Sequence, residues 1–181
     1  MSTYVEIEGL TLDDLIGRIN IQPNVKHEYN DDSEYTKLPI YFEGKQDWPK
    51  HTNLKCGYCT LDIHGIPLFV PRSITSDGRI EVGSSMCSFK CILKTIESFS
   101  KNEYNNLLGL VRILHRKMTG YELESVTSDI NRLELTKFNG TVTPKEFQKK
   151  IYDEHCNKKI YYELFANRAE ANIFIEYFEE I

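Results

Sequence analysis

Hydrophobic residues recur every three to four positions in three stretches of the chain, and this spacing predicts helices. The first stretch is 12–19, and the third is 103–118, which ends at Gly120, a residue typical of helix C-termini. The second stretch begins at Ser88. Its apolar face consists of Phe89, Ile92, Leu93, Ile96 and Phe99. The pattern therefore indicates a largely helical chain.

Capping residues predict two further helices in the C-terminal part. Thr143 and Glu146 have the spacing of a capping box, with Pro144 at the first helical position. Asn167 and Glu170 stand three residues apart in the same way, so the last helix is expected to begin at Asn167 and run to the end of the chain. Its aromatic face includes Phe174, Tyr177 and Phe178. This face is expected to pack on the core or to dock a partner.

Short extended runs predict strands at Leu38–Phe42, Ile66–Pro71 and Arg79–Val82. A turn at 76–78 leads into the last of these strands. Several helices with a few short strands indicate an α+β fold.

Four of the five cysteines stand in two close pairs. Two residues separate Cys56 from Cys59, so both sulfurs can reach one metal ion from a tight turn, in which Gly57 relieves crowding. Cys87 and Cys91 are four residues apart, so on a helix they project from one face. If Cys87 opens that helix, the helix dipole favours its thiolate. This pattern predicts one structural Zn²⁺ in a small treble-clef-like module of four cysteines, embedded in a mainly helical domain.

Alternatives to this zinc site are unligated cysteines, a redox pair, or His64 in place of one cysteine. A catalytic zinc is not expected, because four thiolates leave no open coordination position. The adjacent residues His155 and Cys156 are poorly placed to act as base and nucleophile. The chain has neither a phosphate-binding glycine motif nor the His-x-Glu of zinc deaminases. The sequence therefore predicts no catalytic residues, no small-molecule substrate and no enzyme.

Charge is unevenly distributed along the chain, whose formal net charge is −5. The segment 45–101, which holds the paired cysteines, has eight basic and five acidic residues, whereas 1–44 and 102–181 are both net acidic. We expect three parts: an acidic N-terminal segment (1–44) packed on the core, the zinc module (45–101), and a helical C-terminal region (102–181) forming one compact unit with it. No apolar run is long enough to span a membrane and no secretory signal is evident, which favours a reducing compartment and metal-bound cysteines.

The cysteines belong to a longer pattern of residues. It consists of Trp48-Pro49, Thr52, Cys56-x-x-Cys59, Ile66-Pro67, Gly83, Cys87-Ser-Phe-Lys-Cys91, the leucine-rich segment Leu107–Gly120, Leu135, Phe138-Asn-Gly140, Thr143 and Glu146-Phe147. Over roughly residues 45–150 this pattern resembles the poxvirus late transcription factor 3-like proteins of nucleocytoplasmic large DNA viruses, whose cysteines are in the style of FCS/MYM zinc fingers. Three positions depart from that family: Met86 replaces a phenylalanine, Gly57 a tryptophan and Asn139 a glycine.

The resemblance implies a viral late transcription factor that works in cytoplasmic viral factories of the host cell. Its expected partners are the virus-encoded RNA polymerase or other late transcription factors, with promoter DNA as a further partner. A zinc-stapled virion or assembly scaffold without direct DNA readout is the alternative, and it would place the protein in the virion. The candidate phosphate contacts are the basic residues near the zinc, Lys55, Arg72, Arg79, Lys90 and Lys94. Phe174, Tyr177 and Phe178 are the candidate docking residues.

Overall fold

The computed structural model describes residues 37–124, 128–153 and 163–179, with the side chains of α6 described as far as Ile173. Contacts divide the chain into two units, Met1–Asp31 and Asp32–Ile181, and all described residues belong to the second. The helix predicted over 12–19 therefore lies outside the described residues, as do His155 and Cys156.

A three-stranded antiparallel sheet forms the β part of the fold. It contains β1 (Tyr41–Phe42), β2 (Leu68–Ile74) and β3 (Ile80–Met86), with β3 in the centre. The hairpin of β2 and β3 leads directly into the cysteines at 87 and 91. Together with the helices described below, this sheet confirms the predicted α+β class.

The strands differ in length from those predicted. β1 is shorter, because Pro39 has no N–H group to donate to a neighbouring strand. β2 continues beyond Pro71, which lies at a register shift of the ladder, a place where a sheet tolerates proline. β3 continues through Gly83 to Met86, although its small residues give no strand signal in the sequence.

Two consecutive helices follow the sheet, α2 (Phe89–Ile96) and α3 (Lys101–Thr119). Ser100 caps α3 in a complete capping box with Glu103, and Gly120 ends it in the left-handed conformation with φ 79°. The prediction that Phe99 belongs to the apolar face of α2 is wrong. The helix ends at Ile96, and Phe99 lies beyond it with 44% of its surface exposed.

The C-terminal part contains two short 3₁₀ helices, η1 (Arg132–Glu134) and η2 (Thr136–Phe138), followed by α4 (Pro144–Asp153) and α6 (Arg168–Glu179). The predicted capping box of α4 is confirmed: the Glu146 amide donates to Thr143 Oγ1 (3.3 Å) and the Thr143 amide donates to the Glu146 carboxylate (2.8 Å). The predicted cap of α6 is confirmed as well, because Asn167 Oδ1 accepts from the Glu170 amide (3.0 Å).

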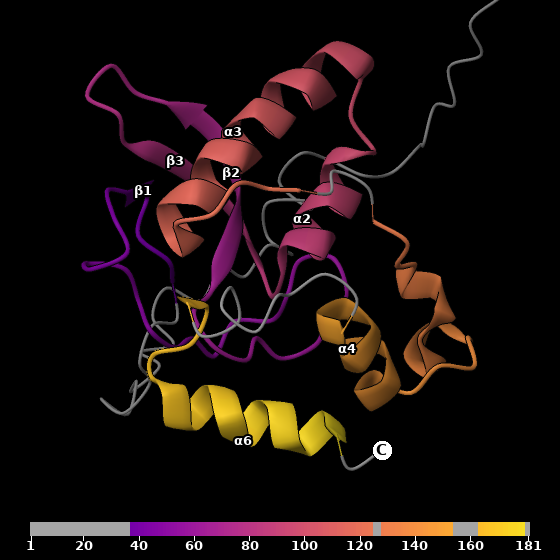
Figure 1. The fold of residues 1–181 in the computed structure, drawn as a ribbon. Coiled ribbons are helices and arrows are strands. Elements are labelled where there is room, and N and C mark those ends of the chain that lie inside the picture. The colour runs from indigo at the N-terminus through magenta and orange to yellow at the C-terminus, as the bar shows by residue number, and fades with distance from the viewer. Residues whose placement is uncertain (1–36, 125–127, 154–162, 180–181) are drawn as a thin grey trace, which may run out of the picture. The chain divides into compact units, whose positions relative to one another are not determined.

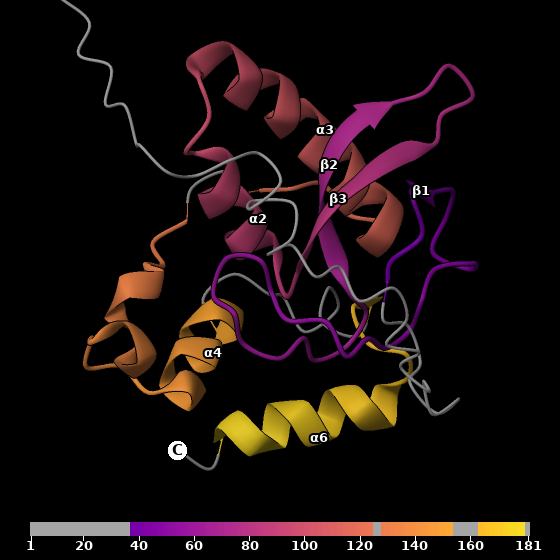
Figure 2. The ribbon, with the colours of Figure 1, turned by 180° about the vertical axis from the view of Figure 1, so that it is seen from behind.

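Helix α3 lies across one face of the sheet and contacts β2 and α2 (Figure 1). Seen from behind, the β2–β3 hairpin lies in front of α3 (Figure 2). The core residues between these elements include Phe69, Ile80, Ile92, Ile96, Val111 and Leu114, all fully buried. One core thus joins the cysteine segment to the helical region that follows it.

Part of the predicted N-terminal segment 1–44 is described. Leu38 and Phe42 lie in the core, with 8% and 0% of their surfaces exposed. The packing of the preceding residues and the three predicted domain boundaries stay predictions. Within the described part of the chain, no helix has the length and apolar character needed to cross a membrane.

Candidate metal centre

The first cysteine pair lies in a tight turn. Lys55 and Asp62 form a bridge at its base, and the Cys56 amide donates to the Leu61 carbonyl (2.9 Å). The Thr60 amide donates back to the Cys56 carbonyl (2.9 Å), and Thr60 adopts the left-handed conformation with φ 62°. The strain of a positive φ therefore falls on Thr60 and not on the glycine inside the turn.

Gly57 lies in a crowded part of this turn, where a larger residue would require its neighbours to shift by a few tenths of an ångström. A Cβ atom there would lie 3.3 Å from Met86, Ser84 and the Ser85 carbonyl oxygen. The Gly57 amide donates to that Ser85 carbonyl (2.7 Å), so the turn is held directly against the end of β3. The predicted role of Gly57 in relieving crowding is thereby explained by its contact with β3.

The second cysteine pair lies where β3 passes into α2. Ser88 is the N-cap of α2, and its hydroxyl oxygen accepts from the Cys91 amide (3.2 Å). Cys87 therefore precedes the helix and does not open it, whereas Cys91 lies in the first turn. The four-residue spacing still brings the two sulfurs together, with Sγ atoms 3.5 Å apart.

The sulfur atoms of all four cysteines lie within 4.8 Å of one another. The Cys59 and Cys87 sulfurs are 3.7 Å apart. A tetrahedral zinc with bonds of about 2.3 Å holds its sulfurs about 3.8 Å apart, whereas a disulfide would bring two of them to about 2.05 Å. The four thiols are free, and their spacing fits a metal ion such as zinc.

The cluster is buried, with between 0% and 6% of each cysteine exposed. Hydrogen bonds from the other three thiols lower the pKa of Cys56, and the bond from Cys59 has the largest effect. The hydrogen bond with Cys56, in turn, raises the pKa of Cys87 and of Cys91. Four thiolates so close together repel one another, so a cation is needed to ionise all four. Bound zinc would supply that positive charge, and its binding would stabilise the folded state.

Neighbouring residues shield the four cysteine sulfurs from solvent. Met86, at the position where the resembling family has a phenylalanine, is 1% exposed, and its sulfur lies 3.9 Å from Cys56 Sγ. The cluster consists of cysteines alone and does not include His64. A zinc ion held by these four residues would have no open coordination position.

Two hydrogen bonds join the second cysteine pair to α4. The Tyr152 hydroxyl donates to the Cys87 carbonyl (3.1 Å), and Lys90 Nζ donates to the Lys150 carbonyl (2.9 Å). Lys90 is only 6% exposed. A buried ammonium group that bonds the protein itself is poorly placed to contact a phosphate, so we leave Lys90 out of the candidate nucleic-acid surface.

The remaining basic candidates lie at the surface in different settings. Lys55 forms an ion pair with Asp62, and Lys94 pairs with Glu97 across one helical turn (2.7 Å). Arg79 pairs with Asp77 (2.8 Å). These three cations already have carboxylate partners, which weakens their attraction for phosphate.

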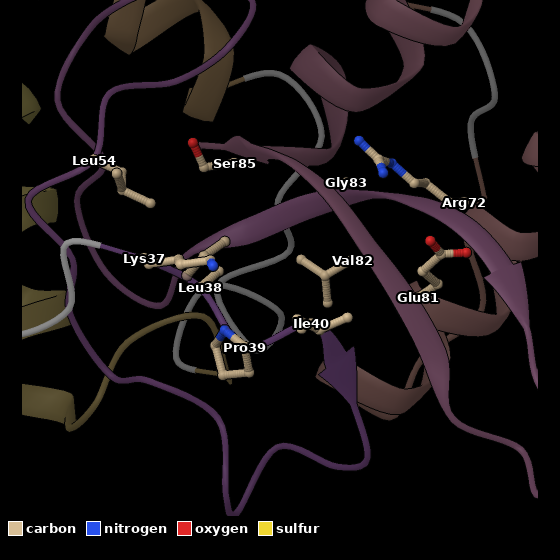
Figure 3. Close-up of a pocket in the computed structure, with 10 residues that line it drawn as sticks. All are labelled: Lys37, Leu38, Pro39, Ile40, Leu54, Arg72, Glu81, Val82, Gly83 and Ser85. Carbon is tan, nitrogen blue, oxygen red and sulfur yellow. The ribbon is translucent and has the colours of Figure 1, made fainter. Parts of the chain in front are cut away.

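Arg72 lines a cleft of about 350 Å³ beside β3. Figure 3 shows its guanidinium on the rim near Glu81, with the side chains of Ile40, Leu54 and Val82 around the cleft. Among the described residues Arg72 forms no ion pair, but Glu81 and Lys37 line the same cleft, so the cleft has charges of both signs. The side chains of Phe174, Tyr177 and Phe178, the candidate docking residues, lie outside the described residues.

Other residues of the sequence pattern have structural roles. Trp48 Nε1 donates to the Pro67 carbonyl (2.7 Å), and the indole packs against Phe42 and Phe69, with ring centroids 5.3 and 5.0 Å away. A Cβ atom at Gly83 would lie 2.6 Å from the Val70 carbonyl oxygen. Trp48 and Gly83, which belong to the sequence pattern but not to the cysteine cluster, therefore serve the packing of the core around it.

The fold and the cysteine cluster define an α+β protein in which a tight turn, a hairpin and the start of a helix bring together four cysteines that could hold a metal ion such as zinc, in a treble-clef-like module. The chain is similar to the uncharacterized protein B175L of African swine fever virus, from the Kenyan isolate KEN-50, the South African isolate Pretoriuskop Pr4 and the Badajoz 1971 strain. In each case 21% of 152 aligned residues are identical, covering 81% of this chain and 87% of the relative.

This similarity indicates an origin in a nucleocytoplasmic large DNA virus. No known family profile matches the chain. No solved structure matches it either.

Proposed function

We propose that this chain is a viral late gene transcription factor whose zinc-stabilised module binds the virus-encoded RNA polymerase or another late factor at promoter DNA. The observation that carries the proposal is the buried four-cysteine cluster, set within a residue pattern that resembles the late transcription factor 3-like proteins. The similarity to a protein of a large DNA virus supports it.

In this proposal the metal has a structural task. Cys56, Cys59, Cys87 and Cys91 would hold one Zn²⁺, whose closed shell stabilises the module and leaves no position for a substrate. The protein would therefore act by binding and not by catalysis. Partner and DNA contacts would come from surface residues such as Arg72, in the viral factories of the host cytoplasm.

The test is depletion of the protein during infection, followed by complementation with variants. Late transcripts should fall while early transcripts persist, and a Cys87→Ser variant should fail to restore them because it loses a metal ligand. Cys156→Ser is the matched control, because it removes the one cysteine outside the two pairs. Polymerase subunits should co-purify with the wild type and the control, and not with Cys87→Ser.

Normal late transcription after depletion would contradict the proposal. If particles then assembled abnormally, the zinc-stapled scaffold would be the better description, a role that the acidic net charge of −5 also suits. Measurement of zinc in the purified wild type and in Cys87→Ser separates loss of metal from loss of a partner contact.

A further inference from the structure

An aromatic and cationic cluster extends from the first cysteine turn to the two 3₁₀ helices. It consists of Tyr58, from the first cysteine turn, and Arg132, Lys137 and Phe138, from η1 and η2. The Arg132 guanidinium carbon lies 5.7 Å from the centroid of the Tyr58 ring and 5.9 Å from that of Phe138. Lys137 Nζ lies 5.5 Å from the Phe138 centroid. Two cations thus meet two aromatic rings within the range of cation–π attraction.

The cluster is accessible to a partner. Arg132 and Lys137 are exposed, and Tyr58 and Phe138 are partly exposed. Leu133, next to Arg132, has 60% of its surface exposed, so the cluster also has an apolar margin. A surface with flat rings, a flat guanidinium and an apolar margin suits a partner that has flat faces of its own.

The charge of the cluster is not cancelled by its neighbours. The nearby carboxylates of Glu134, Asp129 and Glu97 are paired with lysines, at 3.2, 3.5 and 2.7 Å. Arg132 and Lys137 form no ion pair with any described carboxylate. Their positive charge therefore stays available for an anionic partner.

Backbone contacts hold the cluster in place before any partner binds. The Tyr58 hydroxyl accepts from the Arg132 amide (3.3 Å), which joins the cysteine turn to η1. Asn139 adopts the left-handed conformation after Phe138, with φ 65°. A Cβ atom at Gly140 would lie 2.0 Å from the Glu134 carbonyl oxygen, so the chain folds tightly back on itself there. A partner would not have to order this surface, and binding would cost less entropy.

From this geometry we infer that Tyr58, Arg132, Lys137 and Phe138 form a binding site for single-stranded nucleic acid. Unpaired bases stack on aromatic rings and on the arginine plane, and the phosphates lie against the two cations. A duplex hides the base faces that would stack on this site, so it is expected to bind less tightly. This inference rests on the proposed function and adds to it the class of nucleic acid and its contact residues.

The test is fluorescence anisotropy of the zinc-loaded full chain with a labelled 20-nucleotide oligo-dT, compared with a duplex of equal length. Arg132→Gln should weaken binding to the single strand by about 5- to 100-fold, the loss expected for one base-stacking contact. It should also reduce the salt dependence, because one phosphate contact disappears. Phe138→Leu keeps an apolar side chain without a π face, and it should weaken binding in the same range.

Arg112→Gln is the matched control, since it removes the same charge from an exposed position of α3. Equal affinities for the two arginine variants would overturn the inference, and so would tighter binding to the duplex or no binding to the single strand by the wild type. Zinc content and thermal unfolding are measured for both variants. Arg132→Gln is expected to match the wild type in both, so its binding result stands even if Phe138→Leu fails to fold. A negative result would leave the proposed function standing, because co-purification with polymerase and late transcript levels test that function separately.

Discussion

Two lysines one turn apart on α2 have opposite environments. Lys90 is buried and bonds the Lys150 carbonyl, whereas Lys94 lies at the surface in an ion pair with Glu97. Lys90 therefore joins α2 to α4, whereas Lys94 forms only a surface ion pair, a difference that the sequence does not reveal.

We predict that Lys90→Met destabilises the zinc-loaded protein by about 1.5–3 kcal/mol, the usual worth of a hydrogen bond to a charged group. Lys94→Met, the matched control, should change the free energy of unfolding by less than about 1 kcal/mol because surface ion pairs contribute little. Denaturation by urea at constant zinc measures both values. Equal losses would mean that the Lys90 hydrogen bonds are not what holds α2 to α4.

Gly140 and Gly109 offer a second comparison between residues of one type. A Cβ atom at Gly140 would collide with the Glu134 carbonyl, whereas one at Gly109, inside α3, would meet nothing within 4 Å. Gly140→Ala should therefore destabilise the protein by at least about 2 kcal/mol. Gly109→Ala should stabilise it by about 0.5–1 kcal/mol, because alanine favours a helix interior over glycine. Thermal unfolding checks the opposite signs, and a stabilised Gly140→Ala would contradict the tight fold of this loop.

At the scale of the elements, the N-caps fix where the helices begin. Ser100 and Glu103 form a reciprocal pair at the start of α3, with the Ser100 hydroxyl accepting from the Glu103 amide (3.4 Å) and the carboxylate accepting from the Ser100 amide (3.2 Å). The sequence pattern places the beginning of this helix at 103, two residues late, because Lys101 and Asn102 add nothing to the apolar face.

We predict that Ser100→Ala lowers the free energy of unfolding by about 1 kcal/mol, because the hydroxyl that caps α3 is lost. Ser100→Thr retains a hydroxyl that can accept from the Glu103 amide and donate to the Glu103 carboxylate, so its free energy of unfolding should stay within a few tenths of a kcal/mol of the wild type. Chemical denaturation of both variants separates the cap from a general effect of substitution. A loss of similar size in Ser100→Thr would show that the capping hydroxyl is not the source of the effect.

The helices and the cysteine pairs could be predicted from the sequence because their signals are local. Capping boxes and four-residue spacings act within one or two turns, as at Thr143 and Glu146. The extent of β3 could not be predicted, because Gly83 and its neighbours belong to the strand only through pairing with β2. The aromatic and cationic cluster was missed for a related reason, since Tyr58 and Arg132 are far apart in the chain and meet only when the metal module folds.

For the whole molecule, the metal cluster and the C-terminal region behave as parts of one core. Cys87 contributes its sulfur to the cluster and its carbonyl to the Tyr152 hydroxyl. A change at the cysteine cluster should therefore reach α4 through Cys87, and also through the hydrogen bond from Lys90 to the Lys150 carbonyl.

We predict that removal of zinc by a chelator exposes α4 together with α2, because both depend on the position of Cys87. Amide hydrogen exchange should show loss of protection in both helices at the same chelator concentration. The same chelator saturated with zinc beforehand is the control and should have no effect. Continued protection of α4 in the metal-free protein would show that the hydrogen bond to Cys87 is not needed to hold the helix.

The bond between Tyr152 and the Cys87 carbonyl also has a consequence for the order of assembly during synthesis. A ribosome releases the four cysteines well before it releases α4, because chains emerge from the N-terminus. If zinc is bound as proposed, the cysteine segment would capture it while the helical region is still being translated. With that ion bound, helix α4 would meet a Cys87 carbonyl group that is already in place.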